Sequence, residues 1–92
     1  VDEELTNQLE IARYVSENLE NNTLYILCPG STVYALGKIL GLDKSLLGVD
    51  ILFNREIVAK DVNEGQILDI IGDTQSGGIS KGEKVKNIKI IV

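Results

Sequence analysis

The chain has 92 residues and a mass of 10.0 kDa, which is enough for one small domain. Hydrophobic residues make up 43% and charged residues 25%, an ordinary globular composition that excludes a disordered tail or a fibrous repeat. Nine basic residues against fourteen acidic ones give a net charge of −5, so we expect no nucleic-acid partner.

The same composition bears on location and on the kind of site. No segment approaches the roughly 20 apolar residues of a membrane span, so we expect no membrane partner. A single cysteine, Cys28, cannot form an internal disulfide, and the acidic start Val1-Asp2-Glu3-Glu4 is unlike a signal peptide. We therefore expect a cytoplasmic protein. The absence of His excludes His-based catalytic triads and most catalytic zinc sites.

The first elements are a helix, a strand and a second helix. Between Glu3 and Leu19, apolar residues recur every three or four positions, which predicts an amphipathic helix. The apolar run Leu24–Cys28 is typical of a strand that is covered on both faces, as in a parallel sheet. Ser31 or Thr32 is placed to cap a second helix. Gly41 is the residue at which we expect that helix to end.

A β-hairpin is predicted next. Leu47–Phe53 and Glu56–Ala59 have strand character, and Asn54 between them tolerates the left-handed conformation of a tight turn. Asp61 then resembles a helix cap, because Glu64 follows three residues later as in a capping box.

A third helix and a last strand complete the predicted order. Four apolar residues between Ile67 and Ile71 give the helix a broad apolar face, and Gly72–Gly82 is typical of a polar, Gly-rich loop. Asn87–Val92 is the last strand. The order predicts an α/β fold, a Rossmann-like half with flanking helices on a mostly parallel sheet and one β-hairpin. Residues 1–92 are expected to form a single domain or a fragment of a longer chain.

The strongest candidate site is the turn Cys28-Pro29-Gly30-Ser31-Thr32. A glycine turn between a strand end and a helix start leaves backbone N–H groups unpaired at the positive end of the helix dipole, where a phosphate can bind. The hydroxyls of Ser31 and Thr32 would add two donors. In the alternative interpretation, Gly30 only makes the turn and a hydroxyl only caps the helix.

Three further polar residues are candidates for ribose or metal contacts. Asp50 lies in an apolar strand and would face a ligand if it lies at the carboxyl edge of the sheet. Asn63 and Glu64 could bind ribose hydroxyls, although helix capping also explains them. Gly77-Gly78 is interpreted either as a phosphate-binding loop or as a flexible connection.

Three motifs in order resemble the ATP-NAD kinase-like family, and in particular the C-terminal region of its acetoin-catabolism X-like subgroup. They are Leu24–Thr32, Leu46–Asp50 and Asp61–Glu64, and the resemblance covers roughly Leu5–Ile71. Cys28 and Ser31 stand where the subgroup usually has Gly and Thr.

The resemblance implies transfer of a phosphoryl group from ATP, or in some members polyphosphate, to the adenosine 2′-hydroxyl of NAD, with Mg²⁺. It also implies Gly30, Ser31 and Thr32 as nucleotide- or phosphate-binding residues. The family's catalytic GGDGT segment is absent from this sequence, and its long Gly-rich stretch is reduced here to Gln75–Ser80. We therefore expect a phosphotransferase parent and an inactive 92-residue piece.

Two other hypotheses stay open. The chain could be a stand-alone module that binds a small phosphorylated ligand. It could also be a structural α/β piece that forms a homo-oligomer through uncovered strands.

Overall fold

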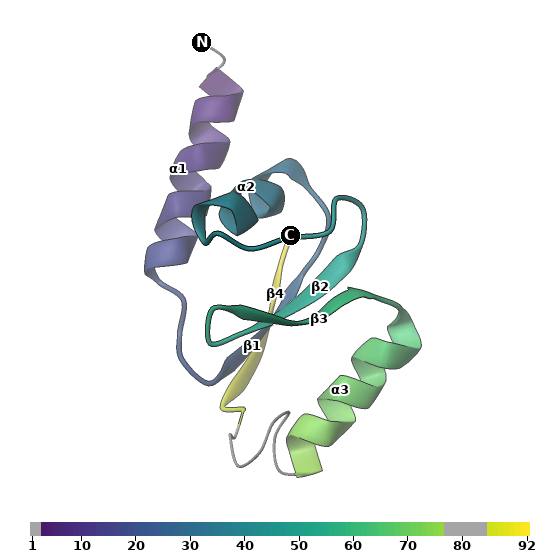
Figure 1. Cartoon of the computed structure of the whole chain (residues 1–92). Helices are drawn as coiled ribbons and strands as arrows, with labels where there is room; N and C mark the ends of the chain where they lie inside the picture. The colour runs from purple at the N-terminus through teal and green to yellow at the C-terminus, as the bar shows by residue number, and fades with distance from the viewer. Residues whose placement is uncertain (1–2, 77–84) are drawn as a thin grey trace.

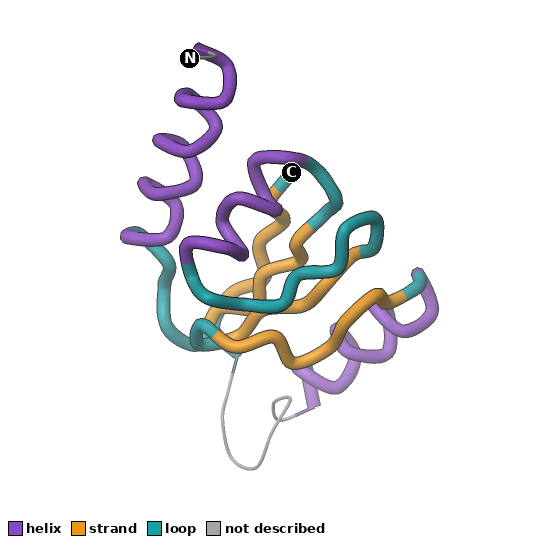
Figure 2. The backbone as a smooth tube through the Cα atoms, turned by 45° about the horizontal axis from the view of Figure 1, so that its top comes forward, coloured by secondary structure: helices purple, strands orange, loops and turns teal. Residues whose placement is uncertain are grey.

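A computed structural model describes residues 3–76 and 85–92 of the chain. These residues form three layers, with α1 and α2 on one face of a sheet and α3 on the other (Figure 1, Figure 2). The elements in chain order are α1 (Glu3–Glu17), β1 (Thr23–Leu27), α2 (Ser31–Ile39), β2 (Val49–Phe53), β3 (Glu56–Val62), α3 (Glu64–Ser76) and β4 (Asn87–Ile91).

The four-stranded sheet is mixed. Its strand order is β3-β2-β1-β4, in which β1 and β4 are parallel while the β1–β2 and β2–β3 pairs are antiparallel. The α/β class, the helices on both faces and the hairpin are confirmed. The predicted mostly parallel sheet is wrong.

The loop between α2 and β2 explains the antiparallel pair. Helix α2 has nine residues and carries the chain about 14 Å away from the end of β1. The loop of residues 40–48 can span about 30 Å when extended, so it can return the chain to its starting edge. There Asp50 lies opposite Leu27, the last residue of β1, and β2 runs back along β1.

Gly41 ends α2 as predicted. Its φ of +71° is left-handed, a conformation that glycine adopts without the steric cost of a Cβ. The Gly41 N–H donates to the Lys38 carbonyl at 3.1 Å, and the Leu42 N–H donates to the Gly37 carbonyl at 2.8 Å. These two bonds form a Schellman motif, which satisfies carbonyls at the helix end.

The hairpin turn is also confirmed. Asn54 and Arg55 both have positive φ, at 49° and 66°, as a two-residue type I′ turn requires. The second arm is longer than predicted because β3 continues to Val62.

The third helix is longer than the glycine pattern predicts. Gly72 lies inside α3, which continues to Ser76, so the predicted loop does not begin at Gly72. A single helical glycine costs only about 1 kcal/mol, which the packing of the helix offsets. The rest of that predicted loop, Gly77-Gly78 included, lies outside the described residues.

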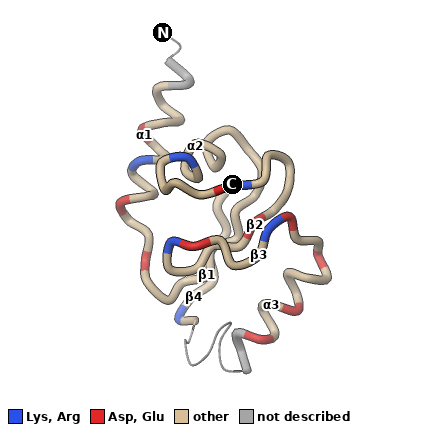
Figure 3. Tube along the Cα trace, in the orientation of Figure 1, with Lys and Arg blue, Asp and Glu red and all other residues tan. Residues whose placement is uncertain are grey.

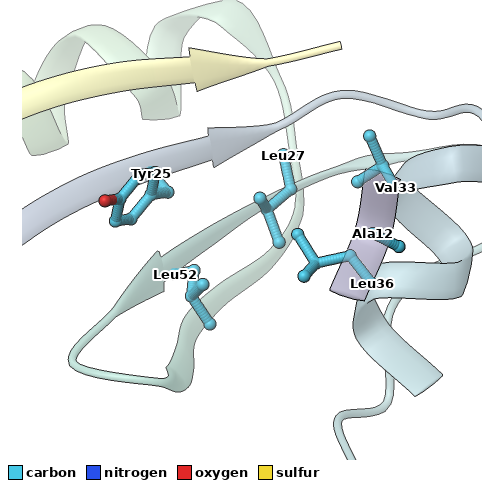
Figure 4. Packing of buried hydrophobic residues seen from close by; sticks show 6 residues of the cluster. All are labelled: Ala12, Tyr25, Leu27, Val33, Leu36 and Leu52. Atoms are coloured by element: carbon cyan, nitrogen blue, oxygen red, sulfur yellow. The ribbon is translucent and has the colours of Figure 1, made fainter. Parts of the chain in front are cut away.

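Strand β1 lies between two hydrophobic clusters, and all five of its residues are buried. This confirms the prediction of a strand covered on both faces. The cluster under α1 and α2 comprises Ala12, Tyr25, Leu27, Val33, Leu36 and Leu52 (Figure 4). The cluster on the α3 side comprises Leu24, Ile26, Ile51 and Phe53, with Ile67, Ile70 and Ile71 of α3 packed against it.

Helix α3 is amphipathic, because its isoleucines pack against the sheet while its acidic residues are exposed. Glu64, Asp69 and Asp73 are all exposed. The acidic positions, red in Figure 3, are spread along the length of α3. Within residues 3–76 and 85–92, no helix combines the length and the hydropathy that crossing a membrane requires.

Candidate functional site

One edge of the sheet gathers the candidate residues. Leu27, the last residue of β1, lies opposite both Asp50 of β2 and Ile91 of β4. Val49 at the start of β2 lies opposite Val62 at the end of β3. Helices α2 and α3 begin directly after β1 and β3, so both start at this edge. We call it the site edge, and it carries Gly30, Ser31, Thr32, Asp50, Asn63 and Glu64.

The start of α2 has no side-chain cap. Gly30 is the N-cap residue, and the first helical bond runs from the Tyr34 N–H to the Gly30 carbonyl at 2.9 Å. Among the residues that the structure describes, no side-chain capping bond closes the helix start. Ser31 and Thr32 lie inside the first turn instead of at the cap position, so the prediction that one of them caps α2 is wrong.

The open start of α2 offers donors to a ligand. Gly30 and Ser31 are exposed and Thr32 is half-buried. The N–H groups of a first helical turn have no intrahelical acceptor and lie at the positive end of the helix dipole. This geometry can hold an oxyanion, and the hydroxyl of Ser31, the first residue of the helix, is a further possible donor.

Asp50 is fully buried, and both of its carboxylate oxygens accept hydrogen bonds. Oδ2 accepts from the Ser45 N–H at 2.7 Å, and Oδ1 accepts from the Ser45 hydroxyl at 2.6 Å and the Asp61 N–H at 2.8 Å. The buried Lys44 ammonium lies 3.6 Å from Oδ2 and donates to the carbonyls of Ser45 and Gly48.

These contacts determine the charge state of Asp50. Burial by itself raises the pKa of Asp50. The hydrogen bonds from Ser45 and Asp61, together with the charge of Lys44, outweigh burial and hold that pKa below its ordinary value of 3.8. The ionised carboxylate therefore anchors the loop of residues 40–48 to β3.

Asn63 caps α3. The Gln66 N–H donates to the Asn63 side-chain oxygen at 2.8 Å, and the Asn63 N–H donates to the Gln66 side-chain oxygen at 2.8 Å. This is a capping box two residues later than predicted. Asp61 is not the cap, because it lies in β3, where its N–H donates a hydrogen bond to the Asp50 carboxylate. Glu64 is the first residue of α3 and is exposed, where its charge is favourable to the helix dipole.

A groove of about 430 Å³ between α1 and α2 begins at the site edge. At one end is Ser31, and further along α2 the ammonium of Lys38 lies 5.1 Å from the centre of the Tyr34 ring. The lining residues are Gln8, Leu9, Ser31, Tyr34, Ala35, Lys38 and Ile39. Such an apolar groove with one cation can hold the less polar part of a small anionic ligand.

The residues that the structure describes include no group of three or more His, Cys, Asp or Glu positioned to hold a metal ion. Cys28 is free and half-buried. The polar groups that the start of α2 offers at the site edge are backbone N–H groups and the Ser31 and Thr32 hydroxyls, which are groups able to donate to an anion.

Sequence reasoning missed the partners of Asp50 and the groove. The sequence pattern predicted no function for Lys44 or Ser45, yet both residues contact the Asp50 carboxylate. A signal was available, since an aspartate in an apolar strand must be paired when it is buried, and Lys44 is the nearest basic residue before it. Tyr34 and Lys38 could be found only by packing α1 against α2.

Comparison of the sequence with protein-family models and with curated proteins, and of the fold with solved structures, found no match.

Proposed function

We propose that this chain contributes a phosphate-facing strand–turn–helix to an ATP-NAD kinase-like protein. The observation that carries the proposal is the start of α2, which is exposed, begins at Gly30 and has no side-chain cap. The motif resemblance described above suggests the nucleotide as the ligand, with ATP or polyphosphate as phosphoryl donor and NAD as acceptor.

Gly30, Ser31 and Thr32 would bind the phosphate. Backbone N–H groups of the first turn would donate to its oxygens, and the exposed Ser31 hydroxyl would add a further donor. The groove that begins at Ser31 would accept the base or the ribose, with Lys38 near a second negative charge.

Asp50 and Asn63 have structural roles in this proposal, because their side chains already have partners within the fold. Asp50 would fix the loop that follows α2, because its oxygens are already bonded to Ser45 and Asp61. Asn63 is bonded to Gln66. The described residues do not fit a Mg²⁺ site, so any Mg²⁺ would be held by the nucleotide phosphates or by other parts of the protein.

Thermal unfolding with and without NAD, ATP and Mg²⁺ tests the proposal. A ligand that binds only the folded chain adds about 2.7 kcal/mol of stability at a hundredfold excess over its Kd. A small domain reports this as an increase in Tm on the order of 10 °C.

A matched pair of variants locates the site. Ser31→Pro removes one N–H and one hydroxyl at the first position of a helix, where proline is well tolerated. Glu64→Pro likewise removes one N–H, together with a carboxylate in place of the hydroxyl, at the first position of α3. We expect the ligand-induced Tm shift to disappear in Ser31→Pro and to persist in Glu64→Pro. No Tm shift in the folded, unsubstituted 92-residue chain would contradict the proposal, and so would equal shifts in both variants.

A further inference from the structure

Strands β3 and β4 are the two edges of the sheet, and they differ in how they are protected. Two shifts in register interrupt the pairing of β3 with β2, and Asp61 near its end has a φ of +50°. Strand β3 also carries two exposed charged residues, Glu56 and Lys60, and Lys60 forms an ion pair with Asp43. Irregular pairing and charge are the usual means of blocking an edge strand.

Strand β4 has neither kind of protection on the α3 side of the sheet. It pairs with β1 without interruption from Asn87 to Ile91. Ile88 and Ile90 lie opposite Leu24 and Ile26, yet they are 38% and 65% exposed. Val92, two residues after Ile90, continues the same alternation and is 86% exposed. An apolar row therefore lies along an open edge.

The backbone of β4 also has hydrogen-bonding groups directed away from the sheet. The Cys28 N–H donates to the Ile91 carbonyl at 3.0 Å, so the backbone groups of Ile91 are directed toward β1. Successive residues of a strand alternate in this respect. The N–H and C=O of Ile90, and likewise those of Ile88, are therefore directed outward.

We propose that β4 pairs with β4 of a second copy of this chain, antiparallel and with Ile90 on the two-fold axis. The exposed apolar row Ile88, Ile90 and Val92 is symmetric about Ile90. Ile90 then faces Ile90 of the other copy, Ile88 faces Val92, and Lys89 faces Ile91. The outward groups of Ile88 and Ile90 meet outward groups of the second copy, which is the hydrogen-bonded arrangement of an antiparallel pair.

Charge favours this register over the neighbouring register that is centred on Lys89. With Lys89 on the axis, two ammonium groups would lie directly opposite each other, which is destabilising. With Ile90 on the axis, Lys89 lies opposite an apolar side chain and keeps its ion pair with Glu20 on the α1 side of the sheet. The interface uses the same patch of both copies, as two-fold dimers do.

Analytical ultracentrifugation of the 92-residue chain tests the pairing, from micromolar to millimolar concentration. We expect a mass that rises to twice the 10.0 kDa of the chain and then stops. A folded chain that stays monomeric overturns the proposal. A series of larger species overturns it too, because a two-fold pair leaves only the blocked β3 edges free.

Variants at position 90 test the register. Ile90→Lys and Ile90→Glu each place like charges opposite each other, so each alone should be monomeric, whereas their equimolar mixture should recover the dimer mass. Val58→Lys is the matched control, because Val58 is an exposed apolar residue, at 48%, on the other edge strand. It should leave the dimer unchanged. A dimer that persists in folded Ile90→Lys, a mixture that stays monomeric, or dissociation by Val58→Lys would each contradict pairing through Ile90.

Discussion

Two helices begin at the same edge of the sheet, and their starts differ. The start of α3 is closed by a capping box in which Asn63 and Gln66 each accept a backbone N–H of the other. The start of α2 is left open at Gly30, where no side-chain capping bond occurs within the described part of the chain. Proximity to the site edge is therefore not enough to make a helix start available to a ligand.

The difference divides the candidate residues by role. On the β2–β3–α3 side, the carboxylate of Asp50 and the amide of Asn63 already have partners within the fold. On the β1–α2 side, the helix begins at the exposed residues Gly30 and Ser31, and the N–H groups of its first turn have no intrahelical acceptor. We expect changes on the first side to alter stability, and changes on the second side to alter binding.

The largest effect is expected for Asp50→Ala. The change removes the acceptor of three hydrogen bonds and leaves the buried Lys44 without its counter-charge. Breaking a buried pair in this way costs about 3–5 kcal/mol, and because Lys44 keeps two carbonyl partners we expect about 3 kcal/mol. Urea unfolding measures this loss. Asp43→Ala is the control. The Asp43 carboxylate is exposed, so its removal should not measurably change the free energy of unfolding.

The pH dependence gives an independent measurement of the same residue. The pKa of Asp50 is lowered in the folded chain, so its ionised form stabilises the fold above the unfolded value near 3.8. That contribution is lost as the pH falls through the lower, folded pKa. The difference in unfolding free energy between the unsubstituted chain and Asp50→Ala should be constant near neutrality and should shrink below about pH 4. A difference that grows in acid would contradict this assignment.

A smaller effect is expected for the cap of α3. Asn63→Ala leaves the Gln66 N–H without its acceptor and should cost about 1 kcal/mol of unfolding free energy. Asn63→Asp keeps an oxygen at the same place and should retain most of the stability. Equal losses in the two variants would show that the capping bond is not what stabilises the start of α3.

The sequence was sufficient for local structure and insufficient for pairing between distant segments. The helical spacing before Leu19, the apolar run of β1, the stop at Gly41 and the turn at Asn54 each predicted an element that the structure contains. Local backbone preferences determine such features. The direction of β2 depends on how the loop of residues 40–48 returns, and its anchor joins Lys44, Ser45, Asp50 and Asp61. No periodicity encodes that anchor.

The capping box shows the same limit at closer range. The spacing of Asp61 and Glu64 matches the motif as well as that of Asn63 and Gln66 does. What decides between them is the contact of the Asp61 N–H with Asp50, eleven residues earlier, which keeps Asp61 in the strand. A tertiary hydrogen bond thus moved the start of α3 by two residues.

The smallest change in stability, and the sharpest test of the comparison, is expected for Ser31→Ala. Its hydroxyl makes no capping bond and is exposed, and alanine is a good helix former, so the unfolding free energy should stay within about 0.5 kcal/mol. A loss as large as that of Asn63→Ala would mean that the start of α2 is capped after all. The difference between the two helix starts would then disappear, and with it the reason to assign the ligand to α2.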